Sequence, residues 1–98
     1  MDVAQEKKVI KLKFPSQLKQ YVGNEKEITV SAETVDEVFQ HLESHYGGLY
    51  ERLLFDDGTL RPYINVFVGK KNIREQEGVH TRISNGDTVS ILLPRAGG

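Results

Sequence analysis

The stretch TVSILLPRAGG occupies residues 88–98 and joins a predicted buried strand to a narrow end. Hydroxyl side chains alternate with apolar ones before a second leucine, which predicts a strand that buries Val89, Ile91 and Leu93 on one face. Pro94 ends this strand because proline has no N–H to give to a neighbouring strand. The stretch therefore predicts a strand anchored in the core that leads directly into residues 95–98.

The last two residues of the sequence are both glycine. Neither Gly97 nor Gly98 has a Cβ, so their backbone can lie flat in a tight channel. An active site that must activate the terminal carboxylate of another protein needs such a slim end. The alternative is an idle end, since chain termini are usually frayed. The strand that precedes the pair favours the functional interpretation.

Two segments of the sequence resemble the MoaD/ThiS family of ubiquitin-like sulfur carriers. The ending ILLPRAGG at 91–98, with Asn85-Gly86-Asp87 just before it, carries most of the resemblance, and RPYINVFV at 61–68 is similar to the family's central strand. The resemblance covers about residues 8–98 and is strongest to members that serve cysteine synthesis. It implies the β-grasp (ubiquitin-like) fold, in which the first and last strands lie parallel at the centre of the sheet.

Composition limits the classes of function. Ninety-eight residues predict one domain, with a flexible lead at 1–7, the folded domain at 8–94 and a flexible tail at 95–98. Lys and Arg number 13 against 14 Asp and Glu, so nothing favours a nucleic-acid partner. The sequence has no cysteine, which excludes disulfides and thiolate chemistry. No apolar run is long enough for a membrane span and no signal peptide is visible, so we expect a cytoplasmic protein.

Alternating patterns predict three further segments of strand. Apolar residues alternate with polar ones over 8–14 and 26–31, which predicts an antiparallel hairpin, and 63–68 reads as a strand with a short return after residue 71. The segment 18–22 reads as irregular, and 75–84 as a polar loop anchored by Val79 and Ile83.

The clearest helix follows Thr34, which stands three residues before Glu37 in the spacing of a capping box. Gly47-Gly48 is expected to end this helix, and 49–55 to add a short helical turn. Together these elements predict an α+β fold, a mixed four- to five-stranded sheet with one main helix packed on one face. The helix carries its apolar side chains in one stripe: Val35, Val38, Phe39, Leu42 and Tyr46.

Other candidate sites have simpler explanations. His41 and His45 stand four residues apart on the helix, a spacing that could hold a metal, but no third ligand is placed and both fall on the solvent side of the stripe. His80 stands alone. Asp56 and Asp57 precede Gly58, so they are better explained as turn residues than as catalytic carboxylates. No nucleophile–base arrangement is present, and we expect neither a bound metal nor an enzyme.

The outer face of the sheet offers a candidate docking patch. Phe67 and Leu92 are out of step with the core-facing residues of their strands, and Tyr63 is expected nearby. Large apolar side chains gathered on a surface usually mark an interaction site. The alternative is that they pack under the loop at 75–84. The family uses an apolar face near its tail for docking, which favours the patch.

The resemblance implies a mechanism at Gly98. A MoeB/ThiF-like adenylyltransferase would bind the sheet face, receive Arg95-Ala96-Gly97-Gly98 and use ATP to convert the Gly98 carboxylate to an acyl-adenylate. A sulfurtransferase or another sulfur donor would then displace AMP and leave a thiocarboxylate. The carrier itself would bind no cofactor. Arg95 departs from the apolar residue that the family often has before Ala-Gly-Gly.

The sulfur acceptor stays open at this point. The resemblance to cysteine-synthesis carriers implies transfer to an aminoacrylate on a PLP-dependent cysteine synthase, whereas molybdopterin and thiamin synthesis would need other partners. A ubiquitin-like modifier joined through Gly98 to lysines of target proteins would use the same activated end. A plain interaction domain with an inert tail is the third alternative.

Overall fold

A hairpin and a crossover build the central sheet. The computed structural model describes residues 8–94. In it, β1 (Val9–Lys13) pairs antiparallel with β2 (Glu27–Ser31), which confirms the predicted hairpin. β5 (Thr88–Leu92) lies parallel to β1, so the first and last strands meet as the β-grasp fold requires.

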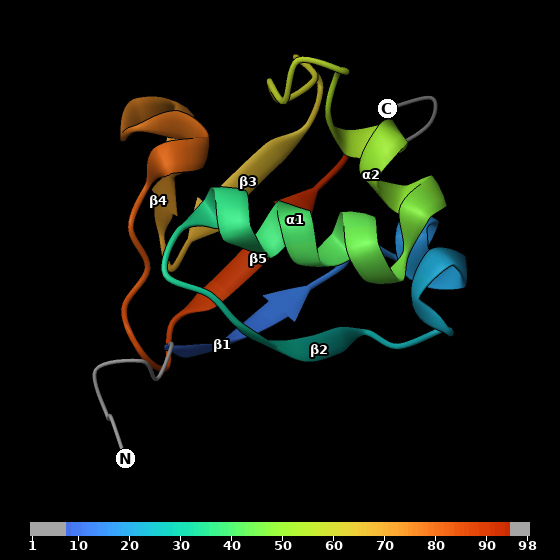
Figure 1. Cartoon of the computed structure of the whole chain (residues 1–98), viewed down its shortest axis with the longest axis horizontal. Coiled ribbons are helices and arrows are strands. Elements are labelled where there is room, and N and C mark those ends of the chain that lie inside the picture. Colours follow the sequence, from blue (N-terminus) through green and yellow to red (C-terminus); the bar gives the residue numbers. More distant parts are fainter. Residues whose placement is uncertain (1–7, 95–98) are drawn as a thin grey trace.

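The other edge of the sheet is formed by β3 (Asn65–Val68) and β4 (Lys71–Asn72). β3 pairs antiparallel with both β5 and β4, which gives the order β2-β1-β5-β3-β4 (Figure 1). β5 therefore has a strand on each side. A strand in the middle of a sheet is shielded from water by its neighbours, and this position fits the apolar composition of β5.

β3 begins later than the predicted strand at 63–68. The N–H of Ile64 donates to the carbonyl of Arg61 over 3.0 Å, which makes a turn there. Arg74 Nη2 donates to the carbonyls of Arg61 and Ile64 over 2.7 and 2.6 Å. These carbonyls are thus held by a side chain rather than by a neighbouring strand.

α1 (Val35–His45) lies across one face of the sheet (Figure 1). Thr34 is the N-cap, as predicted, and its Oγ1 accepts from the N–H of Glu37 at 3.3 Å. The return bond differs from a capping box, because Glu37 Oε1 accepts at 2.9 Å from the N–H of Glu33, one residue before the N-cap. The predicted end was wrong. Tyr46 closes the helix, donating its N–H to the Leu42 carbonyl, and Gly47-Gly48 instead begin α2 (Gly47–Leu53). Neither glycine adopts the positive φ that a glycine stop uses.

Short 3-10 helices replace two segments predicted as irregular or loop. η2 (Ser16–Val22) follows β1 and buries Leu18 and Val22. η3 (Ile73–Glu75) and η4 (Gly78–His80) follow β4. Ile83 is buried and Val79 is partly buried against the core, so both act as the anchors that the sequence predicts.

The core lies between the sheet and the helices that cover it. No helix within residues 8–94 is long and apolar enough to cross a membrane. The largest fully buried side chains come from every layer of the fold: Phe39, Ile10, Leu12, Leu42, Leu49, Leu53, Leu54, Ile64, Ile73, Ile83, Ile91 and Val30.

Candidate functional site

β5 fixes the root of the predicted tail in the middle of the sheet. Val89 and Ile91 are buried on the helix side of this strand, and Leu93 packs partly against the same core. The carbonyl of Pro94 accepts a hydrogen bond from Gln17 Nε2 at 3.4 Å. Residues 89–94 are therefore fixed by core packing and by the hydrogen bond from Gln17. The predicted tail residues Arg95, Ala96, Gly97 and Gly98 lie outside the described residues, as does the predicted lead at 1–7.

The face of the sheet opposite α1 carries an apolar pair beside the end of β5. Leu92 is 47% exposed and Phe67 is half-buried. Leu92 lies opposite Asn65 and Phe67 opposite Ser90, so the two apolar side chains are diagonal neighbours on one face. We call Phe67 and Leu92 the outer-face pair. Their role in docking stays a prediction.

Polar and charged side chains surround the outer-face pair. Lys11 and Lys13 are exposed on β1, and Lys11 Nζ lies 4.0 Å from Glu27 Oε2. On the other side, Asn72 Nδ2 donates to Asn65 Oδ1 at 3.4 Å. An apolar centre with a polar rim is the usual arrangement of a protein interface.

Tyr63 was predicted to lie near this pair, but it precedes β3 and lines a different surface. It is 49% exposed and borders a groove at the end of β5, together with Leu93 and Pro94. The predicted docking patch is thus divided. Two of its residues form the outer-face pair, and the third belongs to the groove.

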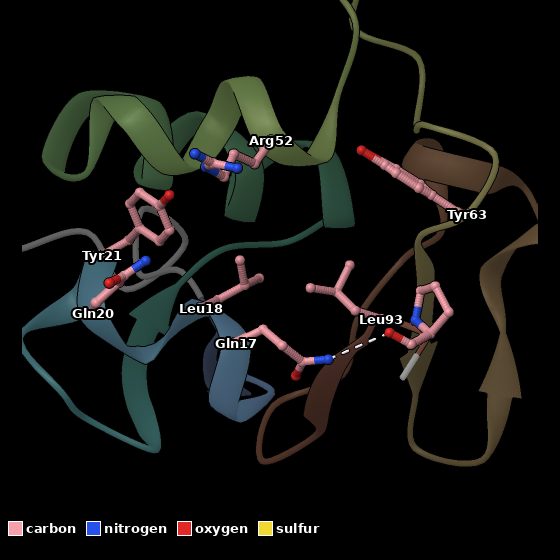
Figure 2. A pocket seen from close by; sticks show the side chains of 8 residues that line it. Gln17, Leu18, Gln20, Tyr21, Arg52, Tyr63 and Leu93 are labelled. Carbon is pink, nitrogen blue, oxygen red and sulfur yellow. Dashed lines mark hydrogen bonds between the residues drawn. The ribbon is translucent and has the colours of Figure 1, made fainter. Parts of the chain in front are cut away.

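Figure 2 shows this groove, which we call the root groove because Pro94 forms part of its wall. It has a volume of about 400 Å³. Leu18 and Leu93 point toward each other, and Tyr21 and Tyr63 stand on opposite sides (Figure 2). The remaining lining is polar and comes from η2 and α2: Gln17, Gln20 and Arg52.

Among residues 8–94, Arg52 is the only charged side chain that lines the root groove. It is exposed, and its guanidinium carbon lies 5.0 Å from the centroid of the Tyr21 ring. Such a cation–π contact holds the guanidinium beside the ring and leaves N–H groups available to another partner. Within residues 8–94, no carboxylate lies at ion-pair distance from Arg52. In the part of the chain that the structure describes, the groove therefore combines an apolar floor with a positive charge that has no carboxylate partner.

The histidine pair shows local interactions. The rings of His41 and His45 stack with centroids 4.1 Å apart, and His45 Nδ1 lies 3.0 Å from the carbonyl of His41. Partial burial, and then the neighbouring His45, lower the pKa of His41. In the described part of the chain, no three His, Cys, Asp or Glu side chains gather as metal ligands. His80 is exposed on η4.

The aspartate pair belongs to a turn, as its sequence predicts. Asp57 Oδ1 accepts from the N–H and from Oγ1 of Thr59, at 3.0 and 2.7 Å. The hydrogen bond from the Thr59 hydroxyl, followed by that from its N–H, lowers the pKa of Asp57. Gly58 has a φ of +86°, which favours glycine there.

Sequence reasoning missed Gln17, Tyr21 and Arg52. Each comes from a short helix that lies far from residue 94 in the sequence, so no local motif connects them. Leu18 and Val22 are both apolar and stand four residues apart, and this spacing was the available signal that 16–22 forms a helical segment facing the core.

Comparison with known proteins gives concordant matches along the chain. The model of the ThiS family matches residues 12–98. The sulfur carrier protein CysO of Mycobacterium tuberculosis is 33% identical over 91 residues, covering 91% of this chain and 98% of that protein. Small archaeal modifier protein 3 of Haloferax volcanii is 38% identical over 65 residues, covering 66% of this chain and 70% of that protein.

A solved structure matches equally well. CysO in the BexX/CysO complex of Amycolatopsis orientalis superposes with a TM-score of 0.84 at 31% identity, covering 91% of this chain and 99% of that one. The fold predicted from the sequence is therefore shared by a carrier that has been crystallised with a partner protein.

Proposed function

The chain belongs to the ThiS family, and we propose that it carries sulfur as a thiocarboxylate on Gly98. The observation that carries the proposal is the match to curated sulfur carriers over 91% of this chain and nearly their whole length. These relatives are carriers and not catalysts. Two features of the sequence support sulfur on Gly98. The sequence holds no cysteine that could carry the sulfur, and the region matched by the family model includes Gly98.

The proposed chemistry takes place on a partner enzyme. A MoeB/ThiF-like adenylyltransferase receives Arg95-Ala96-Gly97-Gly98, and a Gly98 carboxylate oxygen attacks the α-phosphate of ATP. Pyrophosphate leaves and an acyl-adenylate forms. A sulfur donor, for example a sulfurtransferase persulfide, then attacks the acyl carbon and AMP leaves. After the sulfur–sulfur bond is reduced by a thiol, Gly98 ends in a thiocarboxylate.

The structure supports this proposal by the place it gives to residue 94. β5 is held between two strands, and the Pro94 carbonyl is bonded to Gln17, so the tail would start from a fixed point. The outer-face pair lies on the last residues of the same strand and on its neighbour. A partner that binds this pair is thereby positioned to receive the tail, which makes the entry of Gly98 into its active site effectively intramolecular.

Cysteine synthesis is the acceptor pathway that we propose. Its support is the likeness to CysO sulfur carrier proteins, which agrees with the resemblance to cysteine-synthesis carriers. The acceptor would then be a PLP-dependent cysteine synthase that takes the sulfur onto an aminoacrylate. Because the cycle consumes ATP, we place it in the cytoplasm.

The proposal is tested by exchange of labelled pyrophosphate into ATP. The adenylyltransferase of the source organism is mixed with the full chain, or with a variant that lacks Gly98. We expect exchange with the full chain and background exchange with the truncated one. Equal exchange with both would contradict adenylation at Gly98.

A protein-modifier function is the second candidate, and the match to small archaeal modifier protein 3 favours it. The same acyl-adenylate would then be passed to lysine amines of target proteins. Immunoblots of cells that express the tagged chain distinguish the two. Higher-mass conjugates that disappear with deletion of Gly98 would support the modifier, and their absence would support the carrier.

A further inference from the structure

The root groove lies on the side of the sheet that the outer-face pair does not occupy. Leu92 and Leu93 are adjacent in the chain, and successive side chains along a strand point to opposite faces. Leu92 belongs to the outer-face pair, whereas Leu93 lines the groove with Leu18 (Figure 2). A partner that binds the tail therefore meets two surfaces beside residue 94, the outer-face pair and the root groove. Docking on the outer-face pair alone leaves the root groove free.

We propose that the root groove binds a segment of the adenylating partner in which an apolar side chain stands beside a carboxylate. This inference rests on the proposed function. The apolar side chain would lie on Leu18 and Leu93, between Tyr21 and Tyr63. The carboxylate would pair with the guanidinium of Arg52.

Charge complementarity supports an acidic segment. Arg52 is the single charge of the lining, is exposed, and has no carboxylate at ion-pair distance within residues 8–94. Its cation–π contact with Tyr21, with the guanidinium carbon 5.0 Å from the ring centroid, holds it at the edge of the groove. A guanidinium that is already held beside a ring loses less side-chain freedom when it binds a carboxylate through two N–H groups. Aromatic and arginine side chains together are also the residues that most often dominate protein interfaces.

The adenylating partner fits the groove better than the sulfur acceptor does. A sulfur acceptor can recognise a sulfur-loaded carrier by the thiocarboxylate on its last residue. The adenylating enzyme meets a plain carboxylate, and a Gly-Gly end alone does not distinguish this chain from another protein that ends in the same way. Its selectivity must therefore come from surface near the tail. The outer-face pair and the groove both lie there, and the groove is the one that includes Pro94.

The test measures the dissociation constant between the full chain and the ThiF-like adenylyltransferase of the source organism by isothermal titration. Arg52→Glu reverses the charge in the groove. Arg82→Glu is the matched control, because Arg82 is also an exposed arginine but borders a separate surface with Lys70 and Lys71. Both variants change the net charge equally. Tyr63→Ser removes one groove wall outside any strand, and thermal melting verifies that each variant folds.

We expect Arg52→Glu to weaken binding about tenfold or more, because attraction becomes like-charge repulsion. Tyr63→Ser should weaken it about fivefold, and Arg82→Glu should stay within about twofold. Arg52→Lys should lose about threefold, since it keeps the charge without the planar contact. If Arg52→Glu and Tyr63→Ser bind as Arg82→Glu does, the groove inference is wrong.

Failure of the proposed function gives a different pattern. Pyrophosphate exchange is measured on the same samples, together with a variant that lacks 97–98. If the wild type supports exchange and the groove variants bind the adenylyltransferase as tightly as the wild type does, the proposed function stands and the groove inference falls. If no sample supports exchange while Arg52→Glu still weakens binding, the groove binds the partner and the adenylation proposal falls. Absence of wild-type binding would overturn both.

Discussion

Ile91 and Leu92 are neighbours in one strand and have side chains of the same size, but their surroundings differ. Ile91 is 1% exposed in the core under α1, whereas Leu92 is 47% exposed beside Phe67. The free energy gained on folding is roughly proportional to the apolar area removed from water, so Ile91 stabilises the fold and Leu92 contributes little. The comparison indicates that the two faces of β5 divide the work, one for stability and one for recognition.

The largest effect that we expect separates these two neighbours. Ile91→Ala should lower the free energy of unfolding by about 2–5 kcal/mol, because it leaves a cavity in the core. Leu92→Ala should change it by no more than about 0.5 kcal/mol. Urea denaturation followed by circular dichroism measures both, and similar losses in the two variants would remove the basis of the comparison.

The second prediction tests the other face of the strand. Leu92→Glu should keep the stability of the wild type but weaken binding to the adenylating partner by about 1–2 kcal/mol, or five- to thirtyfold. Thr29→Glu on β2 is a control with the same new charge on an exposed strand position away from the end of β5. If Thr29→Glu weakens binding as much as Leu92→Glu, charge and not the outer-face pair would explain the loss.

The third prediction concerns the cap of α1, the helix that covers the buried face of β5. Thr34→Ala removes the oxygen that accepts the N–H of Glu37, and it should cost about 1 kcal/mol of unfolding free energy. Ser44→Ala, on an exposed position of the same helix, should stay within about 0.5 kcal/mol. Equal urea midpoints for the two variants would show that the cap contributes nothing.

The smallest effect concerns a turn that belongs to neither face. Hydrogen bonds from Thr59 hold the folded pKa of Asp57 below its ordinary value of 3.8. A lowered folded pKa means that the charged carboxylate stabilises the turn above pH 3.8, and that this contribution is lost as pH falls through the folded pKa. Asp57→Asn keeps an acceptor oxygen and does not titrate. The stability of the wild type relative to this variant should therefore decline on acidification, and a constant difference would contradict the assignment.

Sequence patterns predicted most of the fold because burial imposes its period on the chain. The alternation in β1, β2 and β5 and the stripe of α1 each follow from one apolar face. The parallel pairing of β1 with β5 came from the family resemblance, since alternation identifies a buried face and not a neighbour. Gly47-Gly48 was misread because glycines can begin a helix as well as end one, and here Tyr46 provides the bend.

The candidate site could be predicted only where it is local in sequence. Phe67 and Leu92 were found because each breaks the alternation of its own strand. Tyr63 was assigned to the same surface by extending β3 too far, past the turn that Arg74 stabilises. The root groove depends on contacts between η2, α2 and the end of β5, and such contacts are set by packing over long sequence separations.

Sulfur on Gly98 would change the mass of the C-terminal peptide, and that mass can be measured in the native protein. The chain is isolated from its source cells, digested, and compared with chain from cells that lack the adenylyltransferase. We expect a peptide heavier by the difference between one sulfur and one oxygen atom, with the change confined to Gly98 and absent from the deletion strain. An unchanged Gly98 in both strains, and also after incubation with the adenylyltransferase, ATP and a sulfur donor, would contradict it.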